Sequence, residues 1–126
     1  MSTLRPGEWD TLAGHFQGAT ISEQADGTAL ICLPDVDLPS GWTATTTTVW
    51  FVVPVGYPAA QPDCFWVAAD LKLESGVVPA SSGAQQLPGN PQPALWFSWH
   101  LASWRPAVDS ISTYARFILR RLADAR

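Results

Sequence analysis

Charge is scarce in this chain. Only 14% of its 126 residues are Asp, Glu, Lys or Arg, the net charge is −4, and Lys72 is the single lysine. Proteins that bind nucleic acids need clustered Lys and Arg to neutralise phosphates, so we expect no nucleic-acid partner. The sequence also lacks a run of about 18 apolar residues, and its first residues form no apolar signal segment. We therefore expect neither a membrane span nor a membrane partner.

Cysteine and histidine are equally sparse. Cys32 and Cys64 are the only two cysteines, too few for a disulfide framework, which favours a reducing cytoplasmic location. Together with His15 and His100 they show no zinc-ligand spacing. Phosphate-cradling glycine motifs are absent as well. The sequence predicts no metal and no cofactor.

Apolar and aromatic residues, in contrast, are abundant. Hydrophobic residues make up 47% of the chain, which includes seven Trp and 11 Pro. This length and composition predict one compact domain over residues 1–126. The frequent prolines disfavour long helices before the C-terminal segment.

The pattern along the chain predicts an α+β domain. An antiparallel meander of four strands is flanked by a short N-terminal helix and a longer C-terminal helix. The expected helices span 5–14 and 106–125, and the expected strands span 18–23, 28–33, 44–53 and 63–67. Residues 34–42 are predicted as a loop, and residues 74–94 as a long irregular loop rich in Gly, Pro and Ser.

The C-terminal helix has the clearest periodicity. One face is apolar and the far end is basic, and Asp109 suits the positive end of the helix dipole. The apolar positions are Val108, Ile111, Ala115, Ile118 and Leu122, and the basic ones are Arg116, Arg120, Arg121 and Arg126. The basic residues indicate a solvated face or a docking surface for an acidic partner.

Two short motifs carry a resemblance to a known family. Tyr57-Pro58-Ala59-Ala60-Gln61-Pro62 precedes a predicted strand, and Trp104-Arg105-Pro106-Ala107 opens the predicted helix. In this order the motifs resemble the ubiquitin-conjugating enzyme superfamily over about residues 17–125. Two finer patterns are similar to those of the bacterial E-type branch of this superfamily. They are Pro62-Asp63-x-Phe65-Trp66 and Phe97-Ser98-Trp99-His100. The resemblance implies an acyl carrier whose partners are a ubiquitin-like protein, its activating enzyme and a deconjugating protease from the same operon.

The chain departs from that family at the expected active site. The usual His-Pro-Asn tripeptide is missing, and the segment reads Ala68-Ala-Asp-Leu-Lys-Leu73. The position of the usual active-site cysteine is Trp96, and no cysteine follows Cys64. The sequence therefore does not predict conventional thioester chemistry.

Ser98 and His100 are the candidate catalytic residues. Both lie near the position where the resemblance implies an active site, and on extended backbone they share a face. A serine hydroxyl needs a base to take its proton, and an imidazole can do this. The product would be an oxyester with the ubiquitin-like protein. Ser81, Ser82 and Cys64 are the alternative nucleophiles.

Two other functions stay open. The missing cysteine also suits a catalytically inactive adaptor that binds a ubiquitin-like protein or its activating enzyme. A third possibility, unrelated to the resemblance, is a small-ligand binder with a Trp-lined pocket.

Overall fold

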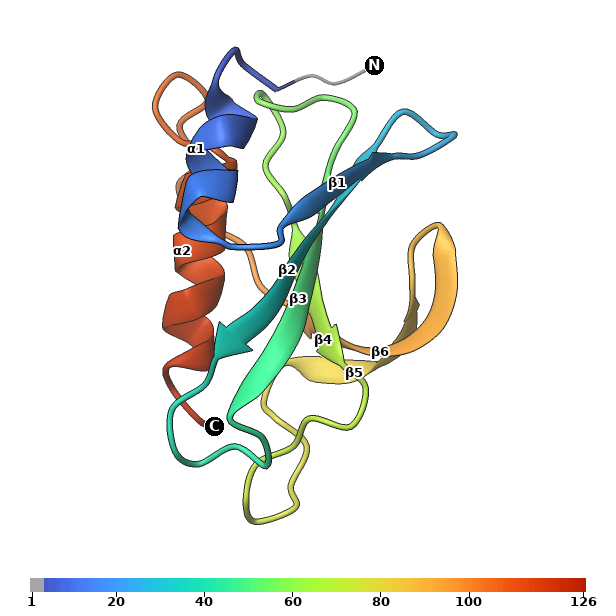
Figure 1. Cartoon of the computed structure of the whole chain (residues 1–126), viewed down its shortest axis with the longest axis vertical. Helices are drawn as coiled ribbons and strands as arrows, with labels where there is room; N and C mark the ends of the chain where they lie inside the picture. Colours follow the sequence, from blue (N-terminus) through green and yellow to red (C-terminus); the bar gives the residue numbers. More distant parts are fainter. Residues whose placement is uncertain (1–3) are drawn as a thin grey trace.

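The computed structural model describes residues 4–126, which form two helices and six strands (Figure 1). In chain order, helix α1 is followed by all six strands and then by helix α2. Their bounds are α1 Glu8–His15, β1 Thr20–Glu23, β2 Ala29–Asp37, β3 Thr46–Val53, β4 Cys64–Ala68, β5 Ser82–Leu87, β6 Asn90–Ser98 and α2 Ile111–Leu122.

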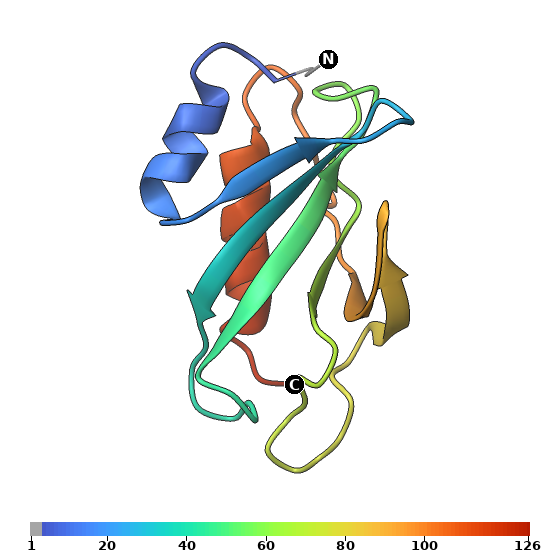
Figure 2. The ribbon, with the colours of Figure 1, turned by 45° about the vertical axis from the view of Figure 1, so that its right-hand side comes forward.

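The strands form one antiparallel sheet in the order β1-β2-β3-β4-β6-β5. Both helices lie against the same face of this sheet, as Figures 1 and 2 show from two sides. The prediction of an α+β fold with an antiparallel sheet between an N-terminal and a C-terminal helix is confirmed. The sheet has six strands, however, and not the four expected.

Successive side chains of the strands point to opposite faces of the sheet, and each face carries its own apolar cluster. Val49, Phe51 and Val53 of β3 face the helices and pack in the main core with fully buried Tyr114 and Ile118 of α2. On the opposite, outer face, a smaller cluster consists of buried Trp66, Leu87 and Ala94 with half-buried Trp50, Val52, Cys64 and Trp96. The outer face of the sheet is therefore partly apolar. Four of the seven residues of this cluster lie on β3 and β4.

The prediction of an irregular loop over 74–94 is wrong for residues 82–94, whereas residues 74–81 form neither helix nor strand. Residues from Ser82 onward form the β5–β6 hairpin, with Ser82 opposite Phe97 and Leu87 opposite Asn90. Proline disfavours sheet interiors because it has no N–H to donate. Pro93 is accommodated because β4 pairs only with Ala94 to Ser98, so β6 pairs at Pro93 with β5 alone.

Two element boundaries also differ from the sequence prediction. Strand β2 continues to Asp37 through a bulge between Leu33 and Val36, in place of a loop from residue 34. Helix α2 begins at Ile111 and not at residue 106, because Ser110 is its N-cap and forms a capping box with Thr113. Val108 therefore lies outside the helix and is 64% exposed, contrary to the predicted apolar face.

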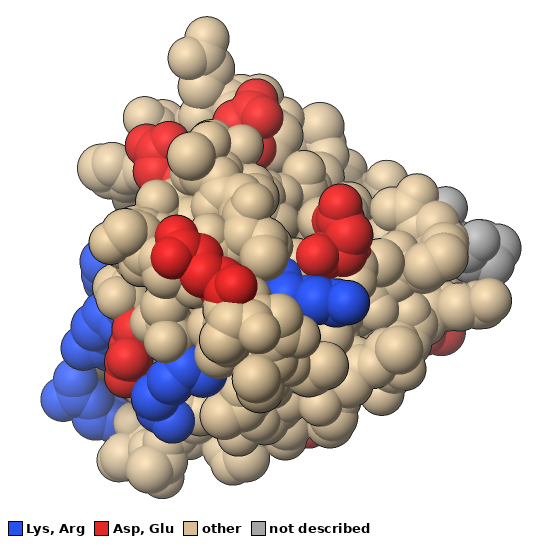
Figure 3. All heavy atoms as spheres, turned by 90° about the horizontal axis from the view of Figure 1, so that it is seen from below, with Lys and Arg blue, Asp and Glu red and all other residues tan. Residues whose placement is uncertain are grey.

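The basic end of α2 is only partly solvated. Arg121 is 2% exposed, lies over the rings of Phe97 and Trp99, and donates to the carbonyl oxygens of Ala80, Asp124 and Arg126. It thus joins α2 to the segment that leads into β5. Basic side chains gather toward one margin of this end of the molecule (Figure 3).

Candidate functional site

Ser98 is the last residue of β6 and is exposed. Its direct partner across the sheet is Cys64, the first residue of β4. Its N–H donates to the carbonyl oxygen of Ser81 at 2.9 Å. Three of the four candidate nucleophiles, Ser98, Cys64 and Ser81, are therefore neighbours where β6 ends and β4 begins. Ser82, the fourth candidate, lies opposite Phe97. Its hydroxyl donates a hydrogen bond to the Pro79 carbonyl at 2.5 Å, so its proton already has an acceptor in the loop.

His100 lies two residues beyond Ser98, next to Asp63. The His100 Nδ1 atom is 3.4 Å from the Asp63 Oδ1 atom, and both side chains are largely exposed. In this arrangement a carboxylate orients one imidazole nitrogen and leaves Nε2 available to a substrate or nucleophile. Within residues 4–126, however, no hydrogen bond joins the Ser98 hydroxyl to the His100 ring. Sequence reasoning missed Asp63, because its contact with His100 joins two segments that are far apart in the sequence.

The segment that follows Ser98 is held in place by side chains from other elements. Gln61 contacts the Leu101 backbone twice, accepting from its N–H and donating to its carbonyl oxygen, each at 2.9 Å. Trp104 donates to the Pro58 carbonyl at 2.7 Å, and Tyr114 donates to the Trp99 carbonyl at 2.6 Å. The predicted Tyr57–Pro62 turn therefore has a structural role, which is to position Leu101 and Trp104, whereas Tyr114 of α2 holds Trp99.

Removal of the double contact at Gln61 is expected to loosen this segment. Gln61→Ala should lower the free energy of unfolding by about 1–2 kcal/mol, because two part-buried backbone groups lose their partner. Amide hydrogen exchange at Leu101 should accelerate beyond what this global loss explains. Gln85→Ala, at an exposed position on β5, is the matched control. Unchanged exchange at Leu101 would show that Gln61 does not hold the segment.

Cys64 is a poor rival to Ser98 as a nucleophile. Its thiol is half-buried, and burial raises its pKa. The Asp63 charge also raises the pKa, whereas the Trp96 hydrogen bond works in the opposite direction. The reactive form of cysteine is the thiolate, so a raised pKa suppresses nucleophilic attack near neutral pH.

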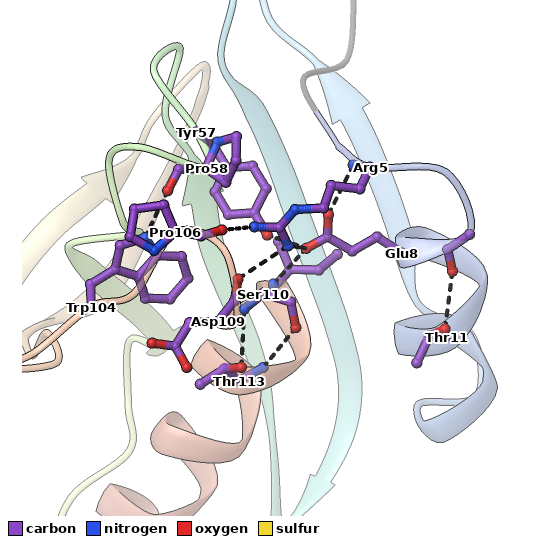
Figure 4. Close-up of polar contacts among 12 residues, drawn as sticks. Arg5, Glu8, Thr11, Tyr57, Pro58, Trp104, Pro106, Asp109, Ser110 and Thr113 are labelled. Atoms are coloured by element: carbon purple, nitrogen blue, oxygen red, sulfur yellow. Dashed lines mark hydrogen bonds and ion pairs between the residues drawn. The ribbon is translucent and has the colours of Figure 1, made fainter.

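A buried carboxylate at Glu8 connects both helices to the Tyr57 turn (Figure 4). Glu8 accepts a hydrogen bond from the Tyr57 hydroxyl and, at 2.9 Å, from the backbone N–H of Ile111, the first residue of α2. Its second oxygen accepts from the backbone N–H of Arg5 at 3.0 Å. Burial and this carboxylate raise the pKa of Tyr57. Sequence reasoning missed Glu8, because nothing local in the sequence marks its distant partners.

Neither a metal cluster nor a spanning helix is found in the part of the chain that the structure describes. No three His, Cys, Asp or Glu residues among residues 4–126 are grouped so that they could hold a metal ion. No helix in the same range is long and apolar enough to cross a membrane.

Comparison with known proteins gave one match. Residues 14–125 match the model of the family described as Prokaryotic E2 family E. No curated protein matches the chain. No solved structure matches it either.

Proposed function

Since the chain belongs to prokaryotic E2 family E, which supports a role in ubiquitin-like conjugation, we propose that it carries a ubiquitin-like protein from an activating enzyme to a target. The family's usual thiol is replaced by the Ser98 hydroxyl, with His100 as the general base. The observation that supports this best is the position of Ser98, exposed at the end of β6 and directly before the segment that leads to α2.

The proposed step is an acyl transfer. The Ser98 Oγ atom attacks the carbonyl carbon of the C-terminal glycine, which arrives as a thioester on the activating enzyme. His100 Nε2 takes the hydroxyl proton, the C–S bond breaks, and the released thiolate is protonated. An oxyester remains on Ser98. An amine or hydroxyl of the target then attacks this ester and regenerates the Ser98 hydroxyl.

The contact between His100 and Asp63 supports the base assignment. A carboxylate beside Nδ1 favours the tautomer that has its proton on Nδ1, so Nε2 keeps its lone pair. Because both side chains are exposed, the pair contributes orientation and little stability.

Intact mass spectrometry tests the proposal. The protein is incubated with ATP and with a ubiquitin-like protein and activating enzyme from the same genome. The wild type is expected to gain the mass of the ubiquitin-like protein minus water, and hydroxylamine should remove it. Ser98→Ala should reduce this adduct at least about 100-fold, because the attacking oxygen is absent. Cys64→Ala, which removes the neighbouring candidate, should retain it. An equally abundant adduct on Ser98→Ala would overturn the assignment.

An inactive adaptor is the second candidate function. It is favoured by the absence of a hydrogen bond between Ser98 and His100 among the described residues. An adaptor would co-elute with the ubiquitin-like protein or the activating enzyme on a sizing column. In the mass measurement it would gain nothing.

A further inference from the structure

Arg121, in the last turn of α2, is buried, with 2% of its surface exposed. Its Nη2 atom donates to the carbonyl oxygens of Ala80 and Arg126, at 2.9 and 2.8 Å. Its Nη1 atom donates to the carbonyl oxygen of Asp124 at 2.9 Å. The end of α2 and the loop that leads into β5 lie at the same end of the molecule (Figures 1 and 2). Arginine is rarely buried unless its donors are bound, so these contacts account for its burial and hold the loop against the helix.

The loop that Arg121 binds contains a strained residue. Ser81 has a φ of 63°, in the left-handed region that disfavours residues with a Cβ atom. Such a residue persists only where the surrounding contacts fix its backbone. Ala80, directly before it, is held twice, because its carbonyl oxygen accepts from Arg121 and its N–H donates to the carbonyl oxygen of Arg126 at 3.2 Å. Arg121 therefore helps to hold Ser81 in this conformation.

The strained residue is bonded to the candidate acceptor. The carbonyl oxygen of Ser81 accepts a hydrogen bond from the Ser98 N–H at 2.9 Å. This bond continues the pairing of β5 with β6 by one residue beyond Ser82 and Phe97. On its other side, Ser98 pairs with Cys64 of β4. The backbone of Ser98 is therefore fixed between β4 and the loop that Arg121 holds.

Arg121 also contacts the two residues that flank Ser98 in the sequence. Its guanidinium carbon lies 5.1 Å from the ring centroid of Phe97 and 5.3 Å from that of Trp99. Both separations are within the range of cation–π attraction, which is stronger where the cation is desolvated. Phe97 is fully buried, so its ring is a fixed support for the guanidinium. One side chain thus acts on Ser98 from two directions, through the loop and through both neighbours in the chain.

We propose that Arg121 is a positioning residue for the acyl transfer, an inference that rests on the proposed carrier function. The guanidinium fixes the backbone of Ser98, so that its Oγ atom is presented to the incoming thioester in one position. Reacting atoms must be held close together and aligned, and a displacement of about 1 Å can lower a rate about 100-fold. Because Arg121 is buried, it acts through Ser98 and does not itself contact the thioester.

Amide signals in NMR spectra test this contact without any partner protein. The ¹⁵N-labelled wild type is compared with Arg121→Met, which keeps a long apolar side chain and removes every donor of the guanidinium. The Ser98 amide proton should move upfield as its bond to Ser81 weakens, and its exchange should accelerate more than exchange at Trp50 in the centre of the sheet. Arg120→Met removes an exposed arginine from the same turn of α2 and should change neither quantity. An unchanged Ser98 amide in Arg121→Met would overturn the proposal.

Arg121→Lys keeps the proposal falsifiable if Arg121→Met fails to fold. Lysine retains a positive charge beside the rings of Phe97 and Trp99, but its single ammonium lacks the planar fork that binds several carbonyl oxygens at once. The Ser98 amide should therefore exchange faster in Arg121→Lys than in the wild type. Equal protection of this amide in the two proteins would overturn the proposal, because the guanidinium fork would then not be needed.

The rate of adduct formation tests the consequence for the reaction. Intact mass spectrometry measures this rate at increasing concentrations of the activating enzyme charged with the ubiquitin-like protein. In Arg121→Met the limiting rate should fall about tenfold or more, because the Ser98 hydroxyl is no longer held in place. The concentration that gives half of the limiting rate should not change, because a buried side chain does not contact the partner. Arg120→Met should keep the wild-type limiting rate.

The failures of the positioning role and of the carrier function are distinguishable. A slower adduct on Arg121→Met, together with a less protected Ser98 amide, supports both proposals. An adduct that forms on Arg121→Met at the wild-type limiting rate overturns the positioning role and leaves the carrier function intact. A wild type that forms no adduct overturns the carrier function, whereas the Ser98 amide of Arg121→Met still decides whether Arg121 holds that residue.

Discussion

Ser98→Cys is expected to convert the covalent adduct from an oxyester into a thioester. A thiol is a better nucleophile than a hydroxyl because a few per cent of it is already thiolate near neutral pH. The adduct should therefore form roughly tenfold faster or more. Dithiothreitol should cleave it, whereas the wild-type adduct should resist dithiothreitol and yield only to hydroxylamine. Intact mass spectrometry with and without reductant measures both effects.

The variant needs a second substitution because Cys64 lies directly opposite Ser98. Opposed Cα atoms in an antiparallel pair fall within the separation that a disulfide bridges, so the new thiol would pair with Cys64 on oxidation. Ser98→Cys is therefore made together with Cys64→Ser, and Cys64→Ser alone is the control. A reductant-sensitive adduct on that control would contradict an acceptor at residue 98. An adduct on the double variant that resists reductant would do the same.

The candidate site was only half predictable from sequence. Ser98 and His100 were predicted because they lie near the active-site position that the family resemblance implies, and their catalytic role stays a prediction. Asp63 and Gln61 act on this segment from the turn that precedes β4, at a separation of about 40 residues along the chain. No local pattern encodes such a contact, because the pairing of β4 with β6 creates it.

The fold was predictable where periodicity is strong and not where proline interrupts it. Strand β3 and helix α2 have regular apolar spacing, and both exist. Residues 82–98 contain prolines, which argue against a strand. These residues still form paired strands, because β6 pairs with β5 alone in its proline-containing half. The start of α2 was misplaced because Pro106 suits a first helical turn. The capping pair Ser110 and Thr113, already visible in the sequence, was the better signal.

Glu8→Ala is expected to cause the largest loss of stability among substitutions outside the apolar core. Glu8 is 8% exposed, and its carboxylate satisfies the Tyr57 hydroxyl and the first backbone N–H of α2. Its removal leaves two buried donors without partners, at about 1–3 kcal/mol for each buried unsatisfied group. We expect the free energy of unfolding to fall by about 3 kcal/mol, measured by urea denaturation.

Two further variants separate the contact from the charge. Asp10→Ala removes an exposed carboxylate from the same helix and should change stability by less than about 0.5 kcal/mol. Glu8→Gln retains an acceptor oxygen and should lose less than Glu8→Ala. If Glu8→Ala costs no more than Asp10→Ala, the buried carboxylate does not hold the helices together.

The Glu8 contact also reaches the candidate site, which gives the substitution a second readout. Tyr57 begins the turn that carries Gln61, and Gln61 fixes the backbone at Leu101, three residues beyond Ser98. A Tyr57 ring without its partner should loosen that turn, so Glu8→Ala should accelerate amide exchange at Leu101. Exchange at Trp50, in the centre of the sheet between β2 and β4, should accelerate only as much as the global loss of stability requires, and less than exchange at Leu101. Equal acceleration at Leu101 and Trp50 would mean that Glu8 stabilises the whole fold and does not act on the site through the turn.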